Sequence, residues 1–132
     1  MAKTQTATWH VDDVQWIELK GLAIQKAAFK TVIDSQFTEG AYNMELTTIA
    51  PGGSSPTHRE PYSHVFYVLS GAGEVRVADE TASLRAGSVS PIRAGQPHSL
   101  RNTGGDDLMM LVIYSPPRTR GARTQQPVSA PQ

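Results

Sequence analysis

The sequence contains no cysteine, which excludes structural disulfides and thiol chemistry. No apolar run approaches the roughly 18 residues that a membrane span requires, and the first residues lack the apolar segment of a signal peptide. Neither sign of charge dominates, because 12 basic and 12 acidic residues balance, and no basic stretch resembles a nucleic-acid footprint. These absences favour a soluble cytoplasmic protein that binds neither membranes nor nucleic acids.

Convincing helical patterns are also scarce, whereas glycine and proline recur between short apolar segments. Short strands separated by Gly/Pro turns are typical of an all-β sandwich or barrel. Residues 22–33 leave two possibilities, because 27–30 could be helical while 31–33 favour a strand, and we expect a strand there. Further strands are expected at residues 14–19, 41–50, 64–69, 74–78, 98–102 and 108–114.

The length of 132 residues is typical of one domain with a sizeable core. Pro116 and Pro117 end the last apolar segment, so we place a single domain at residues 1–117. Residues 118–132 are rich in Arg, Gln, Pro and Ser and offer little apolar surface. Such a segment cannot offset the entropy lost on ordering, and we therefore expect a disordered tail.

Residues 52–71 carry three side chains that can bind a metal ion: His58, Glu60 and His64. His58 and Glu60 are two residues apart, so on a strand both would point to the same face. His64 would lie about 20 Å beyond His58 on a straight strand, which is too far to share an ion. The chain must therefore turn before His64, and Pro61 supplies the break.

The strand that opens near His64 is apolar on both of its expected faces. The two faces carry His64, Phe66 and Val68 on one side and Val65, Tyr67 and Leu69 on the other. This pattern indicates a central strand that is buried on both faces.

His98 is the remaining candidate ligand, and it follows a second stretch that glycine and proline punctuate. We expect a β-scaffold to bring it to the other three side chains. Imidazole and carboxylate donors together suit Fe(II), Mn(II), Ni(II), Cu(II) or Zn(II), and ligand type alone does not choose among them. We expect one divalent transition metal per chain and favour Fe(II) or Mn(II).

These two segments resemble the two motifs of the cupin superfamily. Five positions fit the spacing of the first motif: Gly52, His58, Glu60, His64 and Gly71. The family usually has His at position 60 and Glu at position 64, so this sequence exchanges the two ligand types. The set remains three imidazoles and one carboxylate, which leaves the charge on a divalent ion unchanged.

The second motif is also present, and four positions fit its spacing: Gly87, Gly95, His98 and Asn102. Arg93 stands where the family usually has Pro. The resemblance covers roughly residues 41–115 and is closest to the compact single-domain microbial type. It implies a double-stranded β-helix, which is a jelly-roll barrel with the metal inside its mouth. It also implies that His58, Glu60, His64 and His98 are the ligands.

The resemblance further implies a metal-dependent enzyme that acts on a small organic molecule. We favour a dioxygenase. The first alternative is an isomerase or lyase in which only the imidazoles bind the metal and Glu60 is the catalytic acid or base. The second is a non-catalytic cupin that binds a small molecule. The histidines could also be core or pocket side chains of a cupin that has lost its metal, with Glu60 solvated at the barrel mouth.

Specificity in such a protein depends on the side chains of the pocket. Five residues could line it, although each could equally be part of the core: Met44, Tyr62, Phe66, Leu100 and Tyr114. We also expect a homodimer. Cupins commonly pair through their sheets, and residues 14–19 and 108–114 offer more apolar surface than one small barrel covers.

Overall fold

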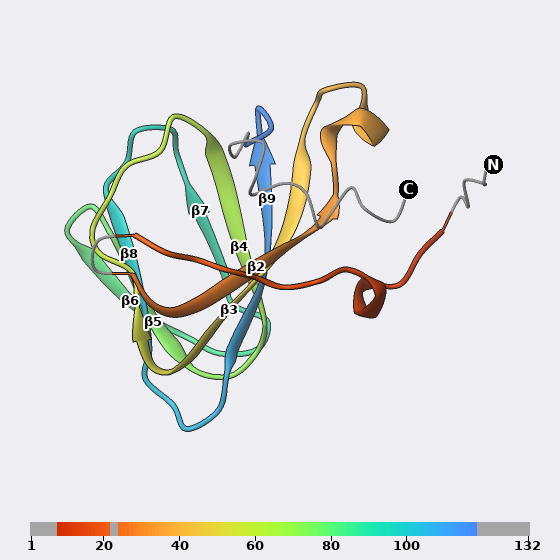
Figure 1. Cartoon of the computed structure of the whole chain (residues 1–132). Coiled ribbons are helices and arrows are strands. Elements are labelled where there is room, and N and C mark those ends of the chain that lie inside the picture. Colours follow the sequence, from red (N-terminus) through yellow and green to blue (C-terminus); the bar gives the residue numbers. More distant parts are fainter. Residues whose placement is uncertain (1–7, 22–23, 119–132) are drawn as a thin grey trace.

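The backbone curls an antiparallel sheet into a barrel (Figure 1). The structure is a computed structural model that describes residues 8–21 and 24–118, and these residues form nine strands and two short 3-10 helices. The elements are η1 Val11–Asp13, β1 Ile17–Glu18, β2 Gln25–Ile33, η2 Ser35–Thr38, β3 Asn43–Ser54, β4 Ser63–Ser70, β5 Gly73–Val77, β6 Glu80–Leu84, β7 Val89–Ile92, β8 His98–Asn102 and β9 Leu108–Ser115.

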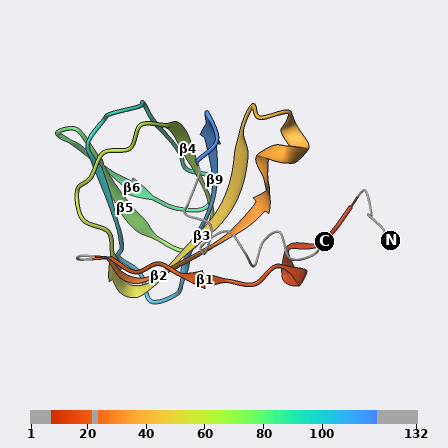
Figure 2. The ribbon, with the colours of Figure 1, turned by 45° about the horizontal axis from the view of Figure 1, so that its top comes forward.

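The strands pair in the order β6-β5-β8-β3-β9-β4-β7, and β2 adds to β3 while β1 adds to β2. Strands β5 and β6 lie on one side of the barrel, and β3, β4 and β9 lie on the other (Figure 1 and Figure 2). The expected all-β fold is thereby confirmed, and it is a jelly-roll barrel. No helix among the described residues is long and apolar enough to cross a membrane.

The barrel interior is filled in rows, because residues paired across a ladder share one face of the sheet. Three successive rows contributed by β4, β9 and β3 are His64-Tyr114-Asn43, Phe66-Val112-Glu45 and Val68-Met110-Thr47. Val68, Met110 and Val112 are fully buried. The apolar core therefore begins directly beneath the row that contains His64.

Strand β3 is longer than expected and joins the two halves of the barrel. Residues 43–49 pair with β9, whereas Ser54 pairs with Arg101 of β8. The strand expected at residues 41–50 therefore continues through the Pro-Gly-Gly stretch to Ser54. Ser54 pairs with Gln25 of β2 as well as with Arg101 of β8, which holds the end of the strand on both sides.

The expectation that β4 is a central strand is confirmed, but the expectation that both of its faces are buried is wrong. β4 is central, since it pairs with β9 on one side and with β7 on the other. It is not buried on both faces, because Tyr67 and Leu69 are 44% and 45% exposed. The barrel interior fills only the concave face of the sheet, and apolar residues alone do not reveal which face is covered.

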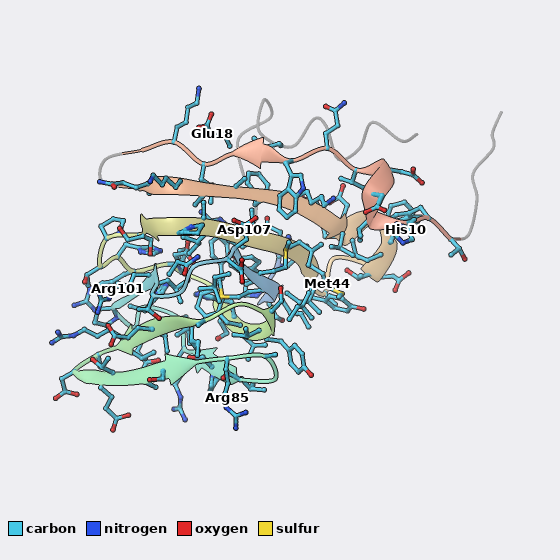
Figure 3. The ribbon with its side chains drawn as sticks, turned by 90° about the horizontal axis from the view of Figure 1, so that it is seen from below. His10, Glu18, Met44, Arg85, Arg101 and Asp107 are labelled. Carbon is cyan, nitrogen blue, oxygen red and sulfur yellow. The ribbon has the colours of Figure 1, made fainter. Side chains whose placement is uncertain are left out.

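The segment at residues 14–19 forms a strand only at Ile17–Glu18. Before this short strand, the buried Lys30 Nζ donates hydrogen bonds to the carbonyls of Val11 at 2.8 Å and Val14 at 3.3 Å. His10 precedes this segment at the periphery of the molecule and caps η1 by accepting from the amide of Asp12 (Figure 3).

Candidate metal centre

Backbone hydrogen bonds join the segment that contains the second motif directly to the segment that contains the first. His58 and His98 exchange both of their backbone hydrogen bonds, each with an N–O distance of 3.0 Å. The Gly95 amide adds a third bond, to the carbonyl of Glu60 at 2.8 Å. These three bonds place the loop that carries His58 and Glu60 against the beginning of β8.

The turn expected at Pro61 is present, and β4 begins two residues later at Ser63. The sequence analysis considered His58 and Glu60 on one strand. In the structure they do not lie on a continuous strand. His58 forms only the isolated bridge to His98, and Glu60 lies in the loop beyond it. Their side chains reach the same point because the bridge holds the loop and the turn returns the chain to His64.

The Glu60 carboxylate lies among the three imidazoles. Its Oε1 is 3.5 Å from His64 Nε2 and 4.0 Å from His98 Nε2, and its Oε2 is 3.7 Å from His58 Nε2. One ligand atom each from His58, Glu60 and His98 lie within 4.8 Å of one another, which is a spacing that a metal ion could bridge. His64 joins this set through its contact with Oε1. The structure therefore brings together all four side chains that the sequence singled out.

Each of these imidazoles is oriented by a backbone carbonyl two residues earlier in the chain. The Nδ1–O distances are 2.8 Å for His58, 3.3 Å for His64 and 2.9 Å for His98. A carbonyl oxygen can only accept a hydrogen bond, so Nδ1 is the protonated nitrogen in this arrangement. Each Nε2 then presents its lone pair to the cluster, which is the arrangement typical of metal-ligating histidine.

Burial keeps two of the imidazoles neutral. The side chains of His64 and His98 are each only 1% exposed, and burial lowers the pKa of both rings. Among the described residues, His64 Nε2 is a buried polar atom without a hydrogen-bond partner. An orphaned buried acceptor costs about 1–3 kcal/mol, and a metal ion would satisfy it. The residues present therefore fit a divalent metal.

Glu60 is held in its ionised form. Burial raises its pKa, but the interaction with His58 and the charge of Arg118 outweigh burial and lower the pKa to about 2. The same interaction with Glu60 raises the pKa of His58, although burial opposes it. The cluster therefore contains one anionic carboxylate, two neutral imidazoles and one imidazole that protonates more readily.

We expect metal affinity to fall as the pH drops, because a proton on His58 Nε2 competes with the metal. The pKa of His58 is raised, so this competition begins at a higher pH than it would for an unperturbed histidine. Below that pKa, the dissociation constant should rise about tenfold per pH unit. Metal titrations between pH 5 and pH 8 would measure the slope. An affinity that does not change with pH would contradict ligation by His58.

Two of the expected pocket residues contact the imidazole of His64, and a third packs against one of them. Phe66 meets it edge-on at 5.3 Å between ring centroids, and Tyr114 lies at 5.1 Å. Tyr62 packs edge-on against Tyr114 at 5.8 Å. Three aromatic rings therefore lie beside the cluster.

The other two expected pocket residues lie elsewhere. Leu100 shares the inward face of β8 with His98 and, like Phe66 and Tyr114, belongs to the buried core. Met44 does not share the inward face with the cluster, because it pairs with Ile113 while the neighbouring Asn43 pairs with Tyr114. Adjacent residues on a strand point to opposite faces, so Met44 lies on the outer face of the sheet.

One residue at the site was not expected from the sequence. Arg118, the first residue of the predicted tail, donates from Nη1 to Glu60 Oε2 at 2.7 Å. Its position depends on the course of the chain after Pro116 and Pro117, and no local pattern indicates that course. Residues 119–132, the rest of the predicted disordered tail, lie outside the described residues.

Comparisons with known proteins agree with this geometry. The family model of the cupin domain matches residues 45–114. Auxin-binding protein 1 of Arabidopsis thaliana is 36% identical over 81 residues, which are 54% of this chain and 41% of that protein. Polyketide synthase CurC of Streptomyces cyaneus is 36% identical over 74 residues, which are 55% of this chain and 48% of that protein. The chain thus spans less than half the length of these two curated relatives.

The fold is also similar to solved structures. The polyketide cyclase RemF from Streptomyces resistomycificus superposes with a TM-score of 0.77 at 22% sequence identity, over 88% of this chain and 83% of that chain. This likeness concerns the fold, while the family match includes both segments that carry the ligand-type side chains. The chain therefore belongs to the cupin domain family.

Proposed function

We propose that this cupin is a metal-dependent enzyme that acts on a small organic molecule. The observation that carries the proposal is the convergence of three Nε2 atoms on one ionised carboxylate, with each imidazole oriented through Nδ1. His58, Glu60, His64 and His98 would hold the metal. Their mixed nitrogen and oxygen donors suit Fe(II) or Mn(II), which we favour, as well as Ni, Cu or Zn.

A bound divalent metal would act as a Lewis acid or bind O2 at an open coordination position. The chain itself supplies orientation and exclusion of water. His64 and His98 are held rigidly by burial and by their carbonyl contacts, and the rings of Tyr62 and Tyr114 border the cluster. If the three imidazoles alone hold the metal, the ionised Glu60 carboxylate, which pairs with Arg118, would be the candidate base beside the substrate.

We favour a dioxygenase among the possible reactions, because three imidazoles and one carboxylate form a donor set that suits Fe(II). A non-oxidative isomerase, lyase or cyclase is the second candidate. Its support is the 36% identity to a protein named as a polyketide synthase and the fold likeness to a polyketide cyclase. The third candidate, a cupin that binds a small molecule without turnover, requires the same pocket.

An oxygen electrode separates these candidates. The protein would be loaded with Fe(II) or Mn(II) and mixed with a panel of small organic acids, enediols and phenols. O2 uptake that matches substrate loss supports the dioxygenase, and substrate loss under anaerobic conditions supports the non-oxidative enzyme. Binding of a panel compound without turnover supports the non-catalytic protein. Metal-free protein is the control.

We further propose that the protein is a homodimer that pairs through the outer face of β4, β7 and β9. Tyr67 of β4 pairs with both Val89 of β7 and Leu111 of β9, so the three side chains share this face. Tyr67 and Val89 are exposed, and Leu111 is half-buried. A second copy would remove this apolar surface from water.

Light scattering should report twice the mass of one chain for the wild type. Tyr67→Glu should shift the protein toward monomer, because a carboxylate in an apolar interface loses its hydration. Ser83→Glu is the matched control, since it adds the same charge at an exposed position of β6. A monomeric wild type at micromolar concentration would contradict the proposal. The cytoplasmic location, and the lack of nucleic-acid and membrane partners, stay predictions from composition.

A further inference from the structure

Arg118 brings a fixed positive charge to the edge of the imidazole cluster. Its Nη1 donates to Glu60 Oε2 at 2.7 Å and to the Tyr114 hydroxyl at 3.2 Å. Its guanidinium carbon lies 5.4 Å from the centroid of the Tyr114 ring. The Glu60 carboxylate therefore presents one oxygen to the imidazoles of His64 and His98 and the other to Arg118.

The backbone that positions Arg118 is also anchored. The Arg118 amide donates to the side chain of the buried Asn43 at 2.7 Å. The Ser115 hydroxyl donates to the carbonyl of Ala41 at 3.1 Å, so two contacts tie the chain after β9 to the beginning of β3. The Arg118 side chain remains 25% exposed. The guanidinium is thus held in place and can still be reached by a small molecule.

A divalent metal at the imidazoles would change the balance of charge around Arg118. Glu60 is the carboxylate that contacts both the imidazoles and Arg118. The metal and the guanidinium would then share this one carboxylate, so positive charge would exceed negative charge there and favour the binding of an anion.

We propose that Arg118 and the bound metal together form a binding site for an anionic oxygen group of a small organic acid. This inference rests on the proposed function and names its substrate class. The planar fork of a guanidinium matches a carboxylate, and its five N–H donors exceed the two contacts described above, both of which use Nη1. The rings of Tyr62 and Tyr114 would pack against a planar carbon skeleton.

Benzoate and its neutral analogue benzamide test this site in metal-loaded protein. Calorimetry should show that Arg118→Gln weakens benzoate binding about 10–100-fold, which is the range for loss of a charge-assisted hydrogen bond. Benzamide affinity and metal content should stay the same. Arg101→Gln is the matched control, because Arg101 is exposed, pairs with Glu74 and points away from the barrel (Figure 3). It should not change either affinity.

Arg118→Lys keeps the charge but loses the planar fork, so we expect benzoate affinity between those of the wild type and Arg118→Gln. This variant still decides the question if Arg118→Gln does not fold. Equal benzoate affinity in the wild type and the Arg118 variants would overturn the inference and leave the proposed function standing. Loss of metal from Arg118→Gln would also overturn it, because Arg118 would then act by positioning Glu60. A wild type that takes up no metal would overturn both.

Discussion

Replacing His98 with alanine is expected to strip the metal from a protein that otherwise carries about one transition metal per chain. His98 lies centrally, with ring centroids 4.3 Å from His58 and 4.9 Å from His64, and its side chain is buried. Loss of an outer-shell partner typically weakens metal binding 10–100-fold, so loss of a ligand should weaken it by at least about 100-fold. Elemental analysis after gel filtration would measure the metal content. His58→Ala should behave in the same way.

His10→Ala is the control for this experiment. It removes an imidazole from the exposed N-terminal segment, where the ring caps η1, and should leave the metal content unchanged. A circular dichroism spectrum like that of the wild type would show that His98→Ala still folds. Equal metal in the wild type, His58→Ala and His98→Ala would contradict the metal centre.

Replacing Gly71 with alanine is expected to lower the free energy of unfolding by about 3 kcal/mol or more. Gly71 lies in the turn between β4 and β5 with a φ of +91°, in the left-handed region. An added Cβ would collide with the carbonyl oxygen of Asp107 and lie 2.8 Å from the Cα of Leu108. Both are backbone atoms, which cannot move without displacing the start of β9. Urea denaturation of both proteins would measure the difference.

Gly87→Ala is the matched control, because Gly87 has the same φ of +91° but an added Cβ would meet nothing within 4 Å. It should cost only the left-handed strain, about 1–2 kcal/mol. The difference between the two variants therefore isolates the close approach of the β4–β5 turn to β9. Equal losses of stability would show that this approach does not constrain Gly71.

Several strands were predictable because their signals are local. The apolar run at residues 108–114 and the alternation at residues 74–78 correspond to β9 and β5. The outer face of β4 was not predictable, since Tyr67 and Leu69 are as apolar as the residues that line the interior. The hydrogen bonds from Lys30 to the carbonyls of Val11 and Val14 were not predictable either, because they join residues that are distant in the chain.

The sequence by itself determined which side chains could bind a metal and the turn that follows Glu60. Residue type and spacing along the chain are sufficient for both, because they depend on donor chemistry and on the missing amide of Pro61. Only the tertiary structure decided that Met44 faces outward and that Arg118 reaches Glu60. Strand register and long-range backbone bonds, such as the bridge between His58 and His98, set those positions, and neither is encoded in a local pattern.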